Sequence, residues 1–259
     1  MYFNPINFWI TSMYNNRMID KGLRSPVWGH LQELRKRLIF GLIGLVVCIA
    51  ISFFFADMII NYLAGPIGGV KNLQAIEVTE SLNVYVRVGL LCGFILSLPW
   101  ILVQMLLFVL PGLTSKEKKW IFLFVPIATI FFLCGVGFAF YIMMPPALEF
   151  MTEFLGIETN VRLKNYIDFV TSLLFWVGIC FEAPLVVFVL AKLRIVNAKM
   201  LLKGWRIAIV VIAIIAAVIT PTGDPVNMAL LMAPLLVLYV LSILMAKFAN
   251  KKNESKNGV

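Results

Sequence analysis

Residues 38–60 read LIFGLIGLVVCIAISFFFADMII and contain a single charged side chain, Asp57. A helix needs about 20 consecutive apolar residues to cross the ~30 Å hydrocarbon core of a bilayer, so this stretch is long enough to span a membrane. Five further apolar runs follow it, at residues 83–109, 120–144, 166–190, 205–220 and 226–246. We therefore expect an all-α, polytopic membrane protein with six transmembrane helices.

The composition of the whole chain agrees with that expectation. Apolar residues make up 61% of the 259 residues and charged residues only 14%, against about 45–50% and about 25% in an ordinary soluble domain. A soluble protein of this size would have too few polar residues to cover its surface. His30 is the single histidine, and no two of the four cysteines form a CxxC pair. Because multi-histidine zinc sites and Ser-His nucleophiles are then excluded, we expect neither an enzyme nor a metal or cofactor.

The basic residues are distributed unevenly between the two sides of the expected membrane. An even number of spans places both termini on one side, and 18 of the 22 Lys and Arg residues fall in the segments on that side. Lys71, Arg87, Arg162 and Lys164 fall on the other side. Because Lys and Arg are retained in cytoplasmic segments, we expect both termini to face the cytoplasm or its organellar equivalent. The net charge of +9 then reflects membrane topology and indicates no nucleic-acid partner.

Prolines and glycines inside the apolar runs predict the shape of the bundle. Four runs contain an internal proline, namely Pro99, Pro126, Pro184 and Pro234. Since each proline removes a backbone donor, we expect bent helices in a concave bundle, although membrane helices also tolerate proline. Gly89 and Gly93 form a GxxxG motif, which permits close helix packing and is weak evidence for self-association. The run at 205–220 is short for a membrane span, unless its boundary is misjudged.

The segment before the first apolar run has the features of a helix at the membrane surface. Ser25 followed by Pro26 is typical of a helix start, and apolar residues then recur at helical spacing up to residue 38, which predicts an amphipathic helix. Glu33 is the one carboxylate among the cations that follow it. Its spacing predicts an i,i+4 ion pair with Arg37.

A second carboxylate, Glu117, lies in the segment between the second and third spans. Thr114 and Glu117 fit the capping box that opens a helix, so Glu117 has a structural explanation of its own. Glu33 and Glu117 also belong to the few acids expected on the side of the termini. Two such carboxylates are able to clamp a cationic ligand, best of all guanidinium groups through bidentate pairing. Both interpretations remain open from the residues alone.

Glu182 lies within the fourth apolar run, in the sequence Phe181-Glu182-Ala183-Pro184. A carboxylate at that depth costs about 2.5–3.5 kcal/mol on insertion scales, so it is a candidate functional residue. Proton relay, docking of a partner helix and a structural hydrogen bond to another helix are the alternatives. Asp224, directly before Pro225, is explained by capping of the sixth span.

Five motifs, taken in order along the chain, resemble those of the TatC family, the multispanning subunits of the Sec-independent twin-arginine protein translocase. They are HLQELRKR at 30–37, LAGP at 63–66, PGLTSKEK at 111–118, FEAP at 181–184 and TPTGD at 220–224. The resemblance implies a receptor, in the bacterial cytoplasmic membrane or in the mitochondrial inner or thylakoid membrane. Such a receptor binds twin-arginine signal peptides of folded cargo, recruits single-span TatA- and TatB-type partners, self-associates and draws on the proton-motive force.

The resemblance also implies roles for particular residues. Glu33 and Glu117 would hold the two arginines of the signal peptide, with Leu34 and Arg35 beside them, and Glu182 would contact a partner helix inside the membrane. The remaining two motif residues, Pro66 and Asp224, would be structural.

The chain is expected to divide into an N-terminal extension (1–27), a six-helix membrane domain (28–248) and a basic tail (249–259). The alternative function is a proton-coupled small-solute transporter with Glu182 as its relay. It predicts repeated halves and more than one buried ionisable group, and we find no clear repeat in the sequence.

Overall fold

The computed structural model describes residues 26–109, 115–153, 161–193, 195–220 and 225–257, and these residues form helices with no β-strand among them. The long helices are α2 (Pro26–Ser52), α4 (Glu80–Val109), α5 (Ser115–Phe138), α7 (Leu163–Lys192) and α10 (Pro225–Asn257). The shorter ones are α3 (Ala56–Leu63), α6 (Met144–Glu153), α8 (Ala198–Lys203) and α9 (Trp205–Ile219). The all-α class expected from the sequence is confirmed.

The expected set of apolar spans is also found. Within the described residues, five helical stretches are long and apolar enough to cross a membrane, and α9 is a shorter apolar helix. At 15 residues α9 is about 22 Å long, so the shortness of the fifth span is real. The third span is longer than the sequence indicated, because α5 continues through a π-helical turn (Ala139–Met143) into α6. Pro145 and Pro146 cannot donate backbone hydrogen bonds, and a π turn is one way for a helix to absorb that loss.

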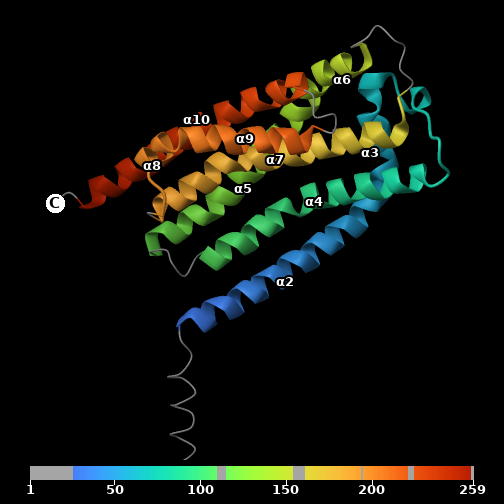
Figure 1. Cartoon of the computed structure of the whole chain (residues 1–259). Helices are drawn as coiled ribbons and strands as arrows, with labels where there is room; N and C mark the ends of the chain where they lie inside the picture. The colour runs from blue at the N-terminus through green and yellow to red at the C-terminus, as the bar shows by residue number, and fades with distance from the viewer. Residues whose placement is uncertain (1–25, 110–114, 154–160, 194, 221–224, 258–259) are drawn as a thin grey trace, which may run out of the picture.

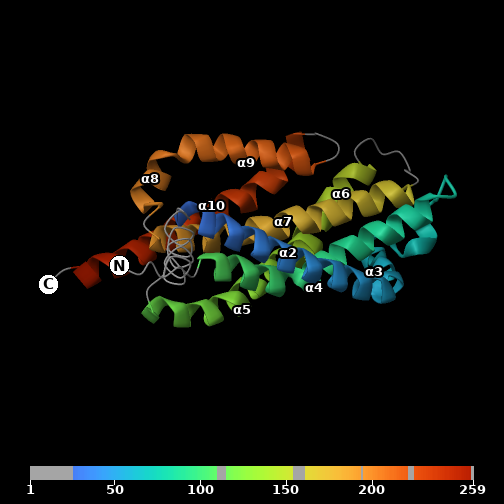
Figure 2. The ribbon, with the colours of Figure 1, turned by 90° about the horizontal axis from the view of Figure 1, so that it is seen from below.

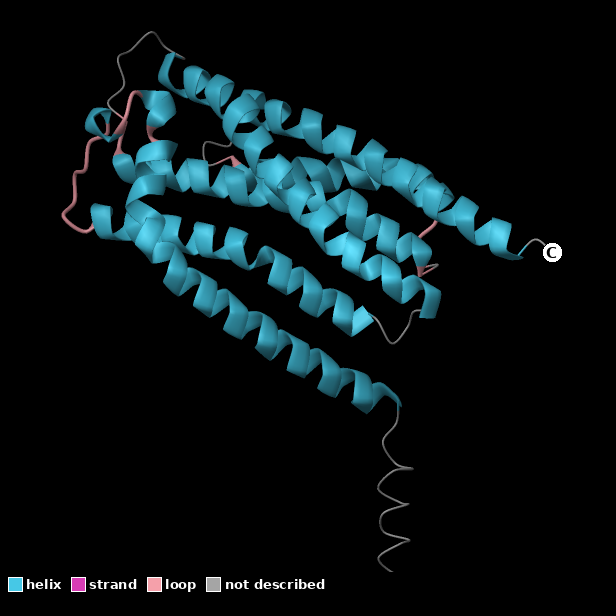
Figure 3. Ribbon diagram, turned by 180° about the vertical axis from the view of Figure 1, so that it is seen from behind, coloured by secondary structure: helices cyan, strands magenta, loops and turns pink. Residues whose placement is uncertain are grey.

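The long helices lie side by side along roughly one direction (Figures 1 and 3). We call the end of the bundle where α2 and α5 begin and α10 finishes the terminus end. The end where α4 and α7 begin is called the cap end. Both ends of the described chain lie at the terminus end, as the even number of spans predicts. Helices α4, α5, α7 and α10 each continue through their internal proline, at Pro99, Pro126, Pro184 and Pro234.

Helix α7 is at the centre of the bundle and packs against α4, α5 and α10 (Figure 2). Its buried side chains include Val170, Leu173 and Val177, which belong to the main apolar cluster. Helix α2 has a different environment, because α4 is its principal helical neighbour. Most of the large apolar side chains of α2 are exposed, including Leu38 and Ile43. In a bilayer those side chains face lipid, which accounts for their hydrophobicity.

Small residues form the seam between α2 and α4. Gly93 lies against the backbone of Ile49, and Gly89 lies against the ring of Phe53. The hydroxyl of Ser52 donates to the carbonyl oxygen of Gly89 at 2.5 Å. The GxxxG motif therefore packs α4 against α2 of the same chain, so the motif gives no support to self-association.

The cap end is closed by contacts between the segment before α4 and the start of α7. The Gln74 N–H donates to the Val161 carbonyl at 3.1 Å, and the Leu163 N–H donates to the Gln74 carbonyl at 2.9 Å. Between these bonds, Arg162 donates to the carboxylates of Glu80 and Glu77. The hydrogen bonds from Arg162 to Glu80 and Glu77 raise the pKa of Arg162 above its ordinary value.

Candidate functional site

Glu33 lies on the first part of α2, at the terminus end. Its Oε1 atom is 3.7 Å from Arg37 Nη2, and both side chains are about 30% exposed, at 31% and 28%. The predicted i,i+4 ion pair is thus confirmed. Such a pair contributes only about 0.3–0.5 kcal/mol, so the carboxylate can exchange Arg37 for a ligand that offers better hydrogen bonds.

The residues next to Glu33 are open to their surroundings. Leu34 and Arg35 are both exposed, and Arg35 lines an open hollow of about 440 Å³ on this part of α2. Lys36, Ile39 and Phe40 line the same hollow. Apolar side chains next to two cations can accept an apolar peptide side chain together with backbone carbonyl groups.

Glu117 is the third residue of α5, which begins at Ser115. This helix start agrees with the predicted capping box, although Thr114 itself lies outside the described residues. Helices α2 and α5 both begin at the terminus end (Figure 1). The fold therefore brings Glu33 and Glu117, which are 84 positions apart in the sequence, to the same end of the bundle.

Glu182 lies inside α7, ten residues before its last residue, Lys192. The side chain is half-buried, and its Oε1 atom has no hydrogen-bond partner among the described residues. One alternative left open by the sequence was a structural hydrogen bond to another helix of the chain. The described residues provide no such bond to Oε1. Buried polar atoms are normally hydrogen-bonded, so a buried orphan oxygen is a candidate contact for another molecule.

Gln104 on α4 is a second residue of this kind, and it was missed by the sequence analysis. Its side chain is 7% exposed, and its Oε1 atom also has no hydrogen-bond partner in the described part of the chain. The available signal was an amide within the apolar run at 83–109. Polar residues in membrane helices are expensive and face the interior or a partner.

Of the two residues assigned structural roles, Pro66 lies within the described residues and Asp224 does not. Pro66 lies at the cap end in the 3₁₀ turn Gly65–Ile67, which is followed by Gly68 and Gly69 with positive φ angles of 86° and 101°. Asp224 lies outside the described residues. Helix α10 begins at the next residue, Pro225, as expected for a capped helix start. No cluster of metal-ligating side chains occurs within residues that the structure describes.

Comparison with known proteins gives consistent matches over most of the chain. The family model of TatC, the Sec-independent protein translocase protein, matches residues 29–234. The TatC protein of Carboxydothermus hydrogenoformans is 37% identical over 92% of this chain and 98% of its own length. The chloroplastic TATC protein of Pisum sativum is 32% identical over 87% of this chain and 65% of its own length. A crystal structure of the twin arginine translocase receptor TatC is 34% identical and superposes with a TM-score of 0.76, covering 85% of this chain and 99% of the other.

Proposed function

The chain belongs to the TatC family of Sec-independent protein translocase proteins, and from that membership we propose that it is a receptor for twin-arginine signal peptides. It would be the core subunit of a translocase that moves folded proteins across a membrane with the proton-motive force. The chain is an integral, multi-pass membrane protein. Its relatives place such proteins in bacterial and chloroplast membranes.

The placement of Glu33 and Glu117 at one end of the bundle is the observation that supports this proposal most strongly. Two adjacent arginines present two planar guanidinium groups, each able to form two parallel hydrogen bonds with a carboxylate. A pair of carboxylates is the matching set of acceptors. Lysine presents a point charge without the planar fork, so a Lys-Lys peptide would satisfy the same carboxylates poorly.

The surroundings of Glu33 also suit an exchangeable site. The ion pair with Arg37 partly neutralises the Glu33 carboxylate when no peptide is bound. Its N···O distance of 3.7 Å makes this pair weaker than a bidentate one. In this proposal Leu34 contacts the apolar part of the peptide, and Arg35 donates to its backbone carbonyl groups. Receptor activity requires no covalent chemistry, in agreement with the single histidine of the chain.

The side on which the signal peptide binds follows from the charge distribution. The four basic residues assigned to the far side lie before the helices that start at the cap end or within their first eight residues, namely Lys71, Arg87, Arg162 and Lys164. The other 18 belong to the segments that join at the terminus end or extend from it. Retention of basic residues in the cytoplasm supports a cytoplasmic position for the terminus end, with Glu33 and Glu117, on the side where cargo is synthesised and folds.

Single-span partners of the TatA and TatB type would assemble on the membrane face of the bundle. The Glu182 oxygen that has no partner in the described part of the chain supports a contact with such a helix, because a polar atom inside the bilayer gains most from a hydrogen bond with another helix. Self-association of the receptor belongs to the same proposal.

Site-specific photocrosslinking in native-like membranes tests the receptor function. A probe placed beside Glu33 or Glu117 should crosslink an Arg-Arg signal peptide and not its Lys-Lys variant. The crosslink should be lost in Glu33→Gln and in Glu117→Gln. It should persist in the matched control Asp57→Asn, which removes an exposed acid from α3 near the cap end. Equal crosslinking of both peptides would contradict the proposal and return the proton-coupled transporter, with Glu182 as its relay, to consideration.

A further inference from the structure

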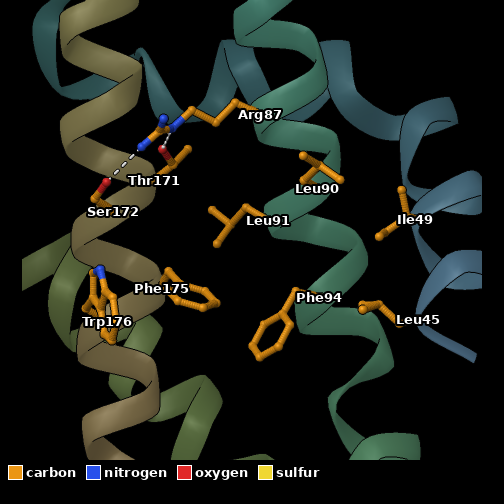
Figure 4. Close-up of a pocket in the computed structure, with 10 residues that line it drawn as sticks. All are labelled: Leu45, Ile49, Arg87, Leu90, Leu91, Phe94, Thr171, Ser172, Phe175 and Trp176. Atoms are coloured by element: carbon orange, nitrogen blue, oxygen red, sulfur yellow. Dashed lines mark hydrogen bonds between the residues drawn. The ribbon is translucent and has the colours of Figure 1, made fainter. Parts of the chain in front are cut away.

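An apolar groove lies between α2, α4 and α7, in the half of the bundle nearer the cap end (Figure 4). Its volume is about 390 Å³, within the range of about 300–1,000 Å³ that is usual for small-molecule sites. Leu90 and Phe94 of α4 and Phe175 of α7 line it, and the rings of Phe94 and Phe175 meet edge to face at 5.0 Å. The lining residues of α4 run along that helix from Arg87 to Phe94.

Arg87 forms the polar end of this groove and reaches from α4 to α7 (Figure 4). Its Nε donates to Thr171 Oγ1 at 2.8 Å and its Nη2 donates to Ser172 Oγ at 2.9 Å and to the Asp168 carbonyl at 3.2 Å. Its Nη1 lies 3.0 Å from Asp168 Oδ1. A guanidinium has five N–H donors, so one N–H of Nη1 has no partner among the described residues. The Arg87 side chain is 43% exposed, so a ligand can approach it.

The position of Arg87 along the span allows its side chain to reach the headgroup region of a bilayer. It lies seven residues after the first residue of α4, or about 10 Å along the helix axis. A long cationic side chain at this depth extends towards the interface, where lipid phosphates lie. Lys164 precedes Asp168 by one helical turn on α7. Arg87, Lys164 and Asp168 together carry a formal charge of +1, which is complementary to a single phosphate.

The size of the groove decides which membrane component can occupy it. One turn of α-helix, about 10 Å across and 5.4 Å long, has a volume of about 420 Å³. At about 390 Å³, the groove is smaller than a single turn of a partner helix. An acyl chain is thinner, and its bends can follow the walls formed by Leu90, Phe94 and Phe175. We propose that this groove binds a membrane glycerophospholipid, with its phosphate at Arg87 and one acyl chain along the apolar walls.

The proposal is tested on the full chain in a neutral detergent, with phosphatidylglycerol as the probe. Native mass spectrometry counts retained lipid, and the shift in Tm reports stabilisation. Arg87→Gln removes the charge and keeps a side-chain N–H donor, whereas Leu90→Trp fills the groove from a position that is 47% exposed. Lys71→Gln is the control, because it removes an exposed cation near the cap end and away from the groove. Each variant is first checked by circular dichroism and by its Tm without lipid.

We expect one retained phosphatidylglycerol with equal affinity in the native chain and in Lys71→Gln. Binding should be roughly tenfold weaker in Arg87→Gln, which loses a charge-assisted hydrogen bond, and similarly weak in Leu90→Trp. Dioleoylglycerol, which lacks the phosphate, and inorganic phosphate alone should give no shift in Tm. Native affinity in Arg87→Gln, or equal stabilisation by dioleoylglycerol, would overturn the proposal. Displacement of the lipid by a synthetic apolar transmembrane peptide would overturn it as well, by making a helix the occupant.

Discussion

Gly93 on α4 and Ile49 on α2 approach so closely that a Cβ atom added to Gly93 would lie 2.5 Å from Ile49 Cα. Ordinary van der Waals contacts begin near 3.5 Å, so one of the two helix backbones would have to move. The contact matters for function because α2 carries Glu33 and has α4 as its principal helical neighbour. The position of one half of the proposed arginine clamp therefore depends on a glycine inside the membrane.

Gly93→Ala should consequently destabilise the protein by about 1–3 kcal/mol, the usual cost of overpacking. This loss should appear even though alanine is the better helix former, by about 1 kcal/mol. Gly137→Ala is the matched control, because a Cβ at Gly137 in α5 has no neighbour within 4 Å. The check is the Tm of both variants in detergent. A Gly93→Ala variant as stable as Gly137→Ala would show that α2 can shift without cost.

Arg162→Gln should open the cap end of the bundle. It removes the cation that pairs with Glu80, whose side chain is fully buried, and leaves a buried carboxylate without its ion pair. Lys164→Gln, two residues further on, removes an equal charge and should lower the Tm much less. Hydrogen exchange of residues 74–80 and 161–163 would locate the change.

Alkaline pH should not have the effect of the Arg162→Gln substitution. Hydrogen bonds to Glu80 and Glu77 raise the folded pKa of Arg162 above its ordinary value. A group with a raised folded pKa contributes stability below its unfolded pKa and loses it only as the pH rises through the folded value. The cap end should therefore remain closed over the whole pH range in which the protein can be handled. If the Tm of the native chain fell to that of Arg162→Gln between pH 7 and 10, the role given to the Arg162 ion pair would be contradicted.

The apolar runs and the helix-start motifs of the chain predicted most of the fold. The start of α2 at Pro26 and of α5 at Ser115 followed from local capping chemistry, which a sequence displays directly. The extension of the third span through Pro145 and Pro146 did not, because two consecutive prolines normally end a helix and the sequence does not show the π turn that precedes them.

The candidate site was predictable only where the contacting residues lie close together in the sequence. The Glu33–Arg37 pair follows from their spacing on one helix. The contacts of Arg87 with Asp168, Thr171 and Ser172 join residues more than 80 positions apart, and nothing in the local sequence marks them as partners. Likewise, Gly89 and Gly93 were recognised as a packing motif, but their use against α2 depends on which helix lies beside α4.

Arg37→Gln should strengthen binding of a twin-arginine peptide. Arg37 competes for the Glu33 carboxylate, and an exposed i,i+4 pair is worth about 0.3–0.5 kcal/mol, so its removal should increase affinity about twofold. Lys36→Gln removes the same charge without freeing Glu33 and controls for the general attraction of a cationic peptide. Peptide titrations at two salt concentrations would separate the two effects, since general attraction is screened by salt. Equal gains in both variants would mean that Arg37 does not occupy the binding carboxylate.

Glu182→Leu should separate binding from transport. Because Glu182 Oε1 has no hydrogen-bond partner among the described residues, replacing the side chain with an apolar one breaks no bond recorded for that atom and removes a costly polar group from the bilayer. The Tm should not fall, and twin-arginine peptide should crosslink near Glu33 as in the native chain. Transport of folded cargo into membrane vesicles should be lost, since the partner helix has no polar contact on α7. Glu182→Gln, which keeps a hydrogen-bonding side chain, should retain part of the transport. A marked fall in Tm in Glu182→Leu would instead assign the carboxyl group a structural role within the bundle.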